Sequence, residues 1–299
     1  MKYFFILLIA FLFPRLMNAQ SEVSITHMQQ RLVAKMTGKA EAEPSVFIHD
    51  RSSKEQRRKS VVLLMEALEE IGLEPEIHSY RYPNVNAFVD LLFDPFRGVN
   101  VYAVIPSTEP DDEYIILGAH YDSEPCAPGA DDNGSGVALV HAVGYELSKL
   151  ETRTINFMLV FFDQEENDEV GSKAFVKMVK KEGMNIHSVH IADMVGWDSD
   201  GDYAVELSPK NSRLIKHYEK AALNLKIPVF TTNVMSSDHK SFYDEGYSTV
   251  LITEEYQNGD FNPYYHSEKD TYDRINFPYL LSCTQLVTAI MKEYATQNR

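Results

Sequence analysis

The alternation of apolar and polar positions predicts helices and strands that follow one another along most of the chain. Ser52 and Glu55 form a capping-box pattern ahead of a helix that runs to about Glu70 with apolar residues on one face. The run Thr154–Phe162 is rich in β-branched and aromatic side chains, which predicts a buried strand. Further strands are expected at Glu76–Tyr82, Asn100–Ile105, Tyr114–Ala119, Ser188–Met194, Val229–Thr232 and Thr249–Thr253. Further helices are expected from near Asn133 to Leu150 and over Gly171–Glu182, Ser212–Leu223 and Phe277–Tyr294.

This alternation predicts an α/β fold, a single-domain three-layer sandwich. Its central sheet should be mixed but mostly parallel, with helices on both faces. No Gly/Ser tract, Pro-rich run or internal repeat interrupts residues 20–299, so one domain is the simplest organisation. In open α/β sheets, ligands bind beyond the carboxyl ends of the strands, and this is where functional residues are expected.

The N-terminus has the pattern of a secretory signal peptide. Lys2 precedes the unbroken apolar run Phe4–Phe13, which is too short to span a bilayer but has the length of a signal core. Ala19 offers a cleavage point, and Pro14 ends the apolar run early, which disfavours an uncleaved membrane anchor. We therefore expect residues 1–19 to be a signal peptide and residues 20–299 to be exported to the periplasm or secreted.

Charge and cysteine content narrow the range of partners. The chain has 44 acidic and 28 basic side chains and a net charge of −16. Such a chain is repelled by nucleic acids and by anionic membrane surfaces, so neither is an expected partner after signal cleavage. Cys126 and Cys283 are the only cysteines. Export permits a disulfide between them, but they are equally compatible with two free thiols.

Polar clusters with metal-binding chemistry occur where the predicted strands end. His120 follows the strand Tyr114–Ala119 and carries the commonest neutral metal ligand. Asp122 lies two residues later, on the same side of an extended segment, and could hold the second ring nitrogen of His120. The segment 129–136, GADDNGSG, crowds Asp131 and Asp132 into a glycine-rich turn before a helix, more carboxylate than an ordinary helix cap requires.

Four more acidic or histidine positions complete the pattern. Glu165 and Glu166 are adjacent carboxylates directly after a buried strand. Their repulsion would be relieved by a metal, with one Glu as ligand and its neighbour as a base. Asp193 ends another strand between apolar residues, where a carboxylate is costly unless it is paired or metal-bound. His266 lies in a turn-rich stretch before the last helix.

Taken in order, these motifs resemble the co-catalytic zinc aminopeptidases, metallopeptidase family twenty-eight. The resemblance spans roughly residues 115–275, and every element of the family pattern occurs in sequence. An ordered set of this kind is far more specific than any single motif. The matching elements are His120-x-Asp122, Asp132 in GADDNGSG, Glu165-Glu166 with Gly171-Ser172, Asp193 in DMVG, Ser237-Asp238-His239, and His266 before Asp270-Thr271.

The resemblance implies a role for each matched residue and two zinc ions as cofactors. Asp132 would bridge the metals. His120 and Asp193 would complete one site, and Glu166 and His266 the other. By the same resemblance, Glu165 would be the general base and Asp122 an outer-shell partner of His120, while His239 would be a residue of the site rim. The family fold agrees with the predicted α/β sandwich.

The activity implied is hydrolysis of the N-terminal peptide bond, with peptides that have a free N-terminus as substrates. An acidic rim suits the cationic amine of such a peptide. Tyr121, Tyr247, Tyr264 and Tyr265 could line an apolar recess for its first side chain, or be half-buried rim aromatics.

Two alternatives remain. One is a glutaminyl cyclase-like enzyme with a single zinc, a close branch of the same family. The short Glu165–Gly171 loop and Tyr265, where cyclases usually have Trp, disfavour it. The other is a non-catalytic descendant of the fold, which is disfavoured because Glu165 and the five ligand positions are all present.

Overall fold

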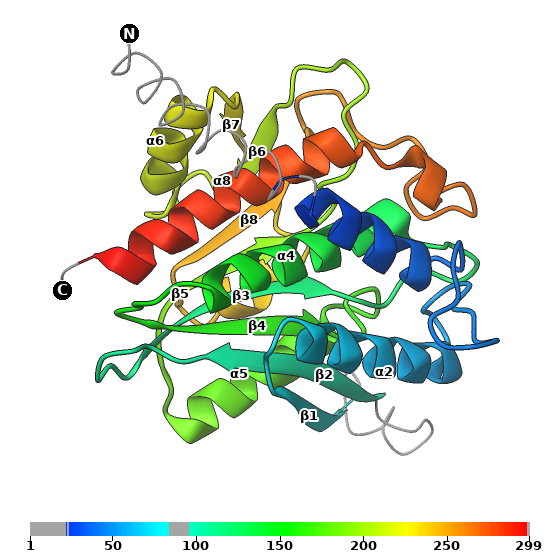
Figure 1. Cartoon of the computed structure of the whole chain (residues 1–299), viewed down its shortest axis with the longest axis horizontal. Coiled ribbons are helices and arrows are strands. Elements are labelled where there is room, and N and C mark those ends of the chain that lie inside the picture. Colours follow the sequence, from blue (N-terminus) through cyan, green and yellow to red (C-terminus); the bar gives the residue numbers. More distant parts are fainter. Residues whose placement is uncertain (1–21, 23, 84–95, 298–299) are drawn as a thin grey trace, which may run out of the picture.

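The structure is a computed structural model that describes residues 22, 24–83 and 96–297. The predicted signal peptide lies outside these residues. The strands form one eight-stranded sheet in the order β1-β2-β4-β3-β5-β8-β6-β7 (Figure 1). Their bounds are β1 Pro75–Tyr82, β2 Phe96–Ile105, β3 Glu113–His120, β4 Asn156–Phe162, β5 Asn185–Ala192, β6 Val205–Ser208, β7 Val229–Thr231 and β8 Thr249–Thr253.

The centre of the sheet is parallel, and antiparallel pairs join it to the outer strands. Strands β4, β3, β5 and β8 pair in parallel, as do β6 and β7, whereas β1 with β2, β2 with β4, and β6 with β8 are antiparallel. The predicted mixed, mostly parallel sheet is therefore confirmed. The parallel arrangement brings the carboxyl ends of β4, β3 and β5 to one edge, where the sequence places its histidine and carboxylate clusters.

Two helical layers enclose the sheet. The helices are α2 Lys54–Glu70, α4 Gly136–Ser148, α5 Val170–Glu182, α6 Ile215–Leu225, α7 His239–Tyr243 and α8 Phe277–Thr296, and residues 24–36 are also helical. Strand β4 shows why the layers form, since all seven of its residues are buried. Alternate side chains face opposite sides of the sheet. Phe157, Leu159 and Phe161 join the core that includes α2, α4 and α8, while Met158, Val160 and Phe162 pack against α5 and α7.

Several local predictions need correction. The N-cap of α2 is Ser53, whose hydroxyl accepts a hydrogen bond from the backbone N–H of Gln56, and not Ser52. Ser52 instead donates its hydroxyl hydrogen to Asp50, which draws it out of the capping position. Strand β6 and the short helix α7 were not predicted, because both are too short to show a periodic pattern. Among the described residues, no helix is long and apolar enough to cross a membrane.

Candidate metal centre

Three neighbouring parallel strands bring most of the predicted site residues together. His120 is the last residue of β3, Glu165 and Glu166 follow β4 closely, and Asp193 directly follows β5. His120 is paired in register with Phe162 at the end of β4, so the polar groups that follow the two strands emerge side by side. The loop at 130–135, which contains Asp132, and the loop with His266 complete the group.

The carboxylate of Asp132 stands between two sets of potential ligands. Its Oδ1 is 3.2 Å from Nε2 of His120, and that nitrogen is 3.4 Å from Oδ1 of Asp193. Its Oδ2 is 3.1 Å from Nε2 of His266, which is 3.0 Å from Oε2 of Glu166. One carboxylate thus faces two separate imidazole–carboxylate pairs, one through each oxygen.

The spacing and the chemistry of these groups fit zinc. Ligand bonds of about 2.1 Å at tetrahedral angles place neighbouring ligand atoms about 3.4 Å apart, close to the observed 3.0–3.4 Å. Nε2 of His120, Oε1 of Glu166 and Oδ1 of Asp193 are buried and have no hydrogen-bond partner among the described residues. Buried polar atoms without partners are costly, and coordination to a metal would satisfy them.

Asp122 connects the end of β3 to the turn that follows β4. Its Oδ1 is 3.5 Å from Nδ1 of His120, on the ring side opposite Asp132. The same carboxylate accepts backbone N–H bonds of 3.0 Å from Glu165 and 3.3 Å from Glu166. Asp122 therefore orients both the imidazole and the turn that carries the Glu pair.

The loop of Asp132 is held by acids that do not face the metal positions. Asp270 accepts hydrogen bonds from the backbone N–H groups of Asp131 and Asp132. Both oxygens of the Asp131 carboxylate accept hydrogen bonds, Oδ1 from the N–H of Gly196 and Oδ2 from the side-chain amide of Asn262. Asp131 is therefore structural, and Asp132 alone of the two carboxylates faces His120 and His266.

Arg51 is the residue of the site that sequence reasoning missed. It is fully buried and donates to the backbone carbonyls of Tyr121 at 2.5 Å, Met36 at 3.2 Å and Gly129 at 2.8 Å, and also to Pro128. Burial lowers its pKa, against the opposing field of the surrounding carboxylates. Its one sequence signal is an arginine outside any amphipathic helix, which does not mark a buried position.

The balance of charge at the centre is strongly negative. Burial and the neighbouring Asp132 raise the pKa of Glu166 to about 7. Burial, with Asp193 nearby, also raises the pKa of Glu165 well above its usual range. For His266, burial acts to lower the pKa, but Asp132 and Glu166 outweigh it and raise the pKa to about 10. Burial is the main cause for the two glutamates, and the neighbouring carboxylates contribute to all three shifts. Divalent cations would balance these carboxylates.

A recess opens beside Glu165, Asp132 and Asp193. Apolar wall residues are Met194, Val234, Leu251, Tyr256 and Tyr265, with Ser236, Ser237 and Thr253 as polar neighbours. Tyr265 stacks on His266 with 3.6 Å between ring centroids. An apolar side chain of moderate size could therefore be held next to the metal positions.

Of the four tyrosines considered for this recess, only Tyr265 lines it. Tyr121 is buried on another side, where its hydroxyl donates to the carbonyl of Val99. Tyr247 packs against Phe242, and Tyr264 packs edge-on against Trp197.

The structure also decides the position of His239 and the state of the two cysteines. His239 is fully buried, with Nε2 3.0 Å from the carbonyl oxygen of Val234, so it is not a rim residue. The two cysteines are free thiols, with Cys126 exposed and Cys283 buried in the core.

The fold and the centre together define a class: a three-layer α/β protein with a two-part histidine–carboxylate centre at the carboxyl ends of its parallel strands. The sequence model described as Peptidase family M28 matches residues 100–291. The chain belongs to this peptidase family, and the resemblance inferred from the motifs is confirmed.

Individual relatives are distant. A probable leucine aminopeptidase of Arthroderma otae is 26% identical over 230 residues, which cover 70% of this chain and 60% of that protein. The chain thus spans about 60% of the length of such a relative. A zinc aminopeptidase from Bacillus subtilis has a similar solved structure, with a TM-score of 0.79 and 15% identity over 91% of this chain and 95% of that chain. Porphyromonas gingivalis glutaminyl cyclase is also similar, with a TM-score of 0.73 and 17% identity over 90% and 98%. The shared fold therefore does not separate the two activities.

Proposed function

We propose that the protein is an exported, zinc-dependent aminopeptidase that removes the N-terminal residue from peptides with a free N-terminus. The observation that carries this proposal is the carboxylate of Asp132, whose two oxygens face different ligand pairs. In the proposed arrangement, two zinc ions would be held by His120, Asp132, Glu166, Asp193 and His266, with His120 and Asp193 on one side of the Asp132 carboxylate and Glu166 and His266 on the other.

Two zinc ions at these positions would polarise the scissile carbonyl and acidify water, which is the chemistry this type of centre supplies. Glu165 is proposed to take the proton from the attacking water and to deliver it to the leaving amine. Its Oε2 is 4.0 Å from Nε2 of His120, and its side chain lines the recess, close to the centre but outside the closest ligand pairs. Asp122 keeps this base in place by accepting the backbone N–H of Glu165.

The recess supports a preference for an apolar first residue. Met194, Val234 and Leu251 offer aliphatic walls, and the carboxylates at its mouth suit a substrate ammonium group. The only tryptophan, Trp197, donates its indole N–H to Asp260 and does not line the recess. A wall of indoles, as expected for a glutaminyl cyclase, is therefore missing from this recess, which favours the peptidase.

The test is a panel of aminoacyl-anilides and N-terminal glutaminyl peptides, assayed with and without a metal chelator. We expect chelator-sensitive release of free N-terminal amino acids, fastest for apolar residues. Ammonia and pyroglutamate from glutaminyl peptides, without release of amino acids from the other substrates, would instead assign the cyclase activity. A folded, zinc-loaded protein inert in both assays would indicate a non-catalytic descendant.

A further inference from the structure

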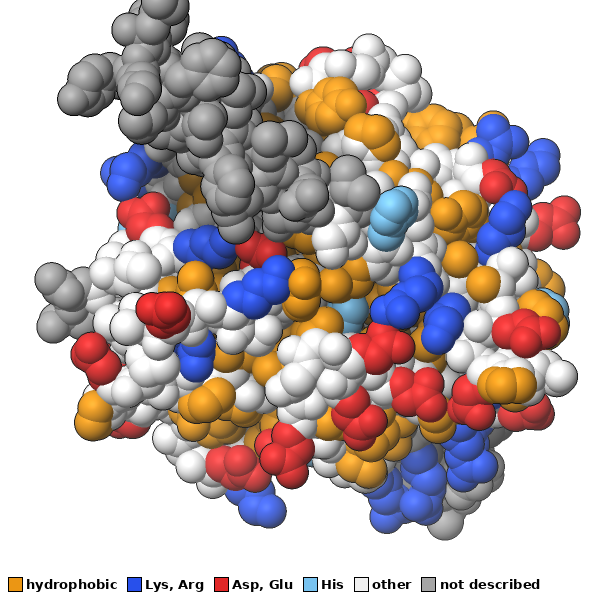
Figure 2. Space-filling model, viewed as in Figure 1, with side chains coloured by type: hydrophobic (Ala, Val, Ile, Leu, Met, Phe, Trp, Pro, Cys, Tyr) orange, Lys and Arg blue, Asp and Glu red, His pale blue; other side chains and the backbone are white. Residues whose placement is uncertain are grey.

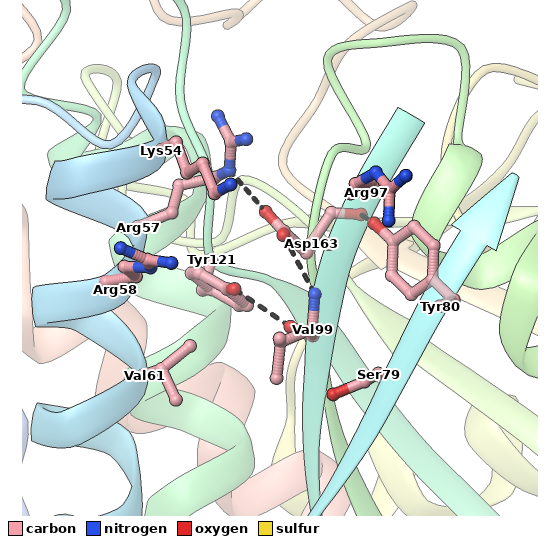
Figure 3. Close-up of a pocket in the computed structure, with 11 residues that line it drawn as sticks. Lys54, Arg57, Arg58, Val61, Ser79, Tyr80, Arg97, Val99, Tyr121 and Asp163 are labelled. Carbon is pink, nitrogen blue, oxygen red and sulfur yellow. Dashed lines mark hydrogen bonds and ion pairs between the residues drawn. The ribbon is translucent and has the colours of Figure 1, made fainter. Parts of the chain in front are cut away.

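A second hollow lies beside the metal centre, between helix α2 and strands β1 and β2, and we call it the basic pocket. Its volume is about 220 Å³, slightly below the range of about 300–1,000 Å³ that drug-sized ligands occupy, so it suits a small ligand. Figure 3 shows helix side chains on one side and strand side chains on the other, with Asp163 between them. The lining residues are Lys54, Arg57, Arg58, Val61, Ser79, Tyr80, Arg97, Gly98, Val99, Tyr121 and Asp163.

The basic pocket is positively charged in a chain whose net charge is −16. It is lined by four cationic side chains and one carboxylate. Lys and Arg side chains gather in the same region, at the lower right of the surface in Figure 2, where α2 meets the first strands in Figure 1. An excess of cations in a concave site concentrates anions there.

The single carboxylate does not neutralise this excess. Oδ1 of Asp163 is 2.8 Å from Nε of Arg57, and Oδ2 accepts the N–H of Val99 at 3.1 Å. Both partners of this ion pair are largely buried, with side-chain exposures of 12% for Arg57 and 3% for Asp163. The pair therefore holds the charge of Arg57 against Asp163 and forms part of the pocket wall.

The other three cations, Lys54, Arg58 and Arg97, keep their charge available. None of their side chains forms an ion pair or hydrogen bond with another residue that the structure describes. Lys54 is the first residue of α2, so the positive end of the helix dipole adds to the same field. Guanidinium groups present fork-shaped donors that suit the oxygens of carboxylates and phosphates.

The floor of the pocket is apolar and already ordered. Tyr121 is fully buried, and its hydroxyl is fixed by the carbonyl of Val99 at 2.8 Å. The hydroxyl of Tyr80 donates to Gln164 Oε1 at 3.0 Å, and Val61 completes the wall on the helix side. A ligand would therefore meet the partly exposed Tyr80 and Val61 below and cations at the rim.

From this arrangement we propose that the basic pocket binds a small oxyanion attached to an apolar body, held by Lys54, Arg58 and Arg97. The C-terminal residue of a peptide has this chemistry, and a free phosphate shares the anionic part. Tyr121 directly follows His120, and Asp163 precedes Glu165 by two residues, so the ligand would sit against the segments that carry the metal centre.

The experiment measures binding directly by isothermal titration calorimetry on the zinc-loaded protein. Three probes are used at low salt: N-acetylphenylalanine, its C-terminal amide, and inorganic phosphate. The acetyl group blocks the N-terminus, so an aminopeptidase would not consume the probe. We expect N-acetylphenylalanine to bind, the uncharged amide to bind at least about tenfold more weakly, and added salt to weaken the interaction.

Matched variants distinguish binding in this pocket from binding at the metal centre and from a general effect of the protein's net charge. Arg58→Gln and Arg97→Gln each remove one exposed cation and should weaken binding about two- to fivefold, the range for exposed ion pairs. Lys59→Gln is the control, because Lys59 neighbours Arg58 on α2 but pairs with Glu55 and does not line the pocket. Binding by Lys59→Gln should match the wild type.

The outcomes are distinct. If N-acetylphenylalanine binds and both arginine variants lose affinity, the pocket recognises a peptide-like carboxylate. If phosphate alone binds, with the same dependence on the arginines, the pocket is an anion site whose ligand is an inorganic oxyanion. If no probe binds, or if the affinities of the arginine variants equal that of Lys59→Gln, the proposal is overturned. None of these results depends on peptidase activity.

Discussion

At the scale of single residues, the chemistry of the centre depends on which oxygen faces which neighbour. Asp131 and Asp132 are adjacent and both buried, yet only Asp132 contacts the histidines. Asp131 is occupied by the N–H of Gly196 and the amide of Asn262. A carboxylate that is directed at other donors and away from the histidines is a poor candidate for metal binding, and this separates the two acids.

Glu165, the proposed general base, gives the most specific prediction for a single residue. Glu165→Gln should lower kcat by about 10²–10⁴-fold, because the amide cannot accept the proton of the attacking water. Zinc content should stay unchanged, since Glu165 is proposed not to be a ligand. The measurement combines steady-state kinetics with metal analysis of the purified variant.

Asp168→Asn is the matched control for this substitution. Asp168 lies in the same loop, its side chain is 91% exposed, and its one ion pair within the described part of the chain is with Lys173. Its activity should remain within about twofold of the wild type, the effect of losing one exposed ion pair at most. A Glu165→Gln variant with near wild-type turnover would show that the two glutamates have been assigned in the wrong order.

At the scale of elements, Arg51 joins segments that are far apart in sequence. Its guanidinium bonds the end of the helical stretch 24–36, the residue after β3, and the loop that leads to Asp132. A Cβ on Gly129 would lie 2.4 Å from Nη2 of Arg51, so the glycine leaves room for this contact. The loop geometry at the centre therefore depends on one buried cation.

Replacing Arg51 should destabilise the fold. Arg51→Met leaves several buried carbonyls unpaired and should lower the free energy of unfolding by about 3–5 kcal/mol in urea titrations. Arg51→Lys keeps the charge without the fork of donors, so it should fall between the wild type and Arg51→Met and should bind zinc more weakly in competition with a chelator.

Arg153→Met provides the comparison, because Arg153 also donates to backbone carbonyls but lies near the surface. It should cost no more than about 1 kcal/mol. Equal stability of Arg51→Met and Arg153→Met would mean that Arg51 does not support the loop.

Strand β5 contributes a pH dependence through His190. This residue is fully buried, with Nδ1 2.8 Å from the hydroxyl of Tyr218 and Nε2 3.0 Å from that of Ser188. Burial, with smaller effects of His187 and His217, lowers its pKa from 6.5 to about 3. The folded state therefore holds His190 neutral, while the unfolded chain takes up a proton below pH 6.5.

Because only the unfolded chain binds this proton, the free energy of unfolding falls as the pH is lowered. The contribution of His190 to stability is complete above pH 6.5 and is lost as the pH falls toward 3, by up to about 1.4 kcal/mol per pH unit. His190→Gln removes the titrating group and should flatten the fall in unfolding free energy between pH 7 and pH 5. Denaturant titrations at both pH values measure it, and identical slopes in the two proteins would contradict the assignment.

At the scale of the whole molecule, the metal centre joins three strands and two long loops, so metal binding should stabilise the fold. A ligand that binds only the folded state at about 1,000 times its Kd adds about 4 kcal/mol. We therefore expect a chelator to abolish activity and to lower Tm by about 8–16 °C. Added zinc should restore both at about two ions per chain.

Two variants test whether loss of the bound metal causes this change in Tm. Glu165→Gln should keep the chelator-induced change in Tm, whereas Asp132→Asn should lose most of it. Saturation at one zinc per chain would remove the bridging role of Asp132 and point to the single-zinc alternative.

Much of the molecule was determined by the sequence alone. Periodic apolar runs encode helices and strands locally, which is why the α/β class, strand β8 and the buried strand β4 were predicted. Ligand chemistry is also a property of residue type, so His120, Asp132 and His266 were identifiable as candidates before their distances were known. The order of the motifs then indicated the family.

Only the tertiary structure decided what depends on contacts between distant segments. Arg51 reaches Gly129 across 78 positions and Asp270 reaches Asp132 across 138, and neither contact leaves a periodic signal. The same reason explains why Tyr121 lies outside the recess and why His239 is buried. The basic pocket exists because α2 packs over β1 and β2, which brings separate cations to one side of a buried ion pair. Local sequence sets which groups are present, whereas long-range packing sets which of them meet.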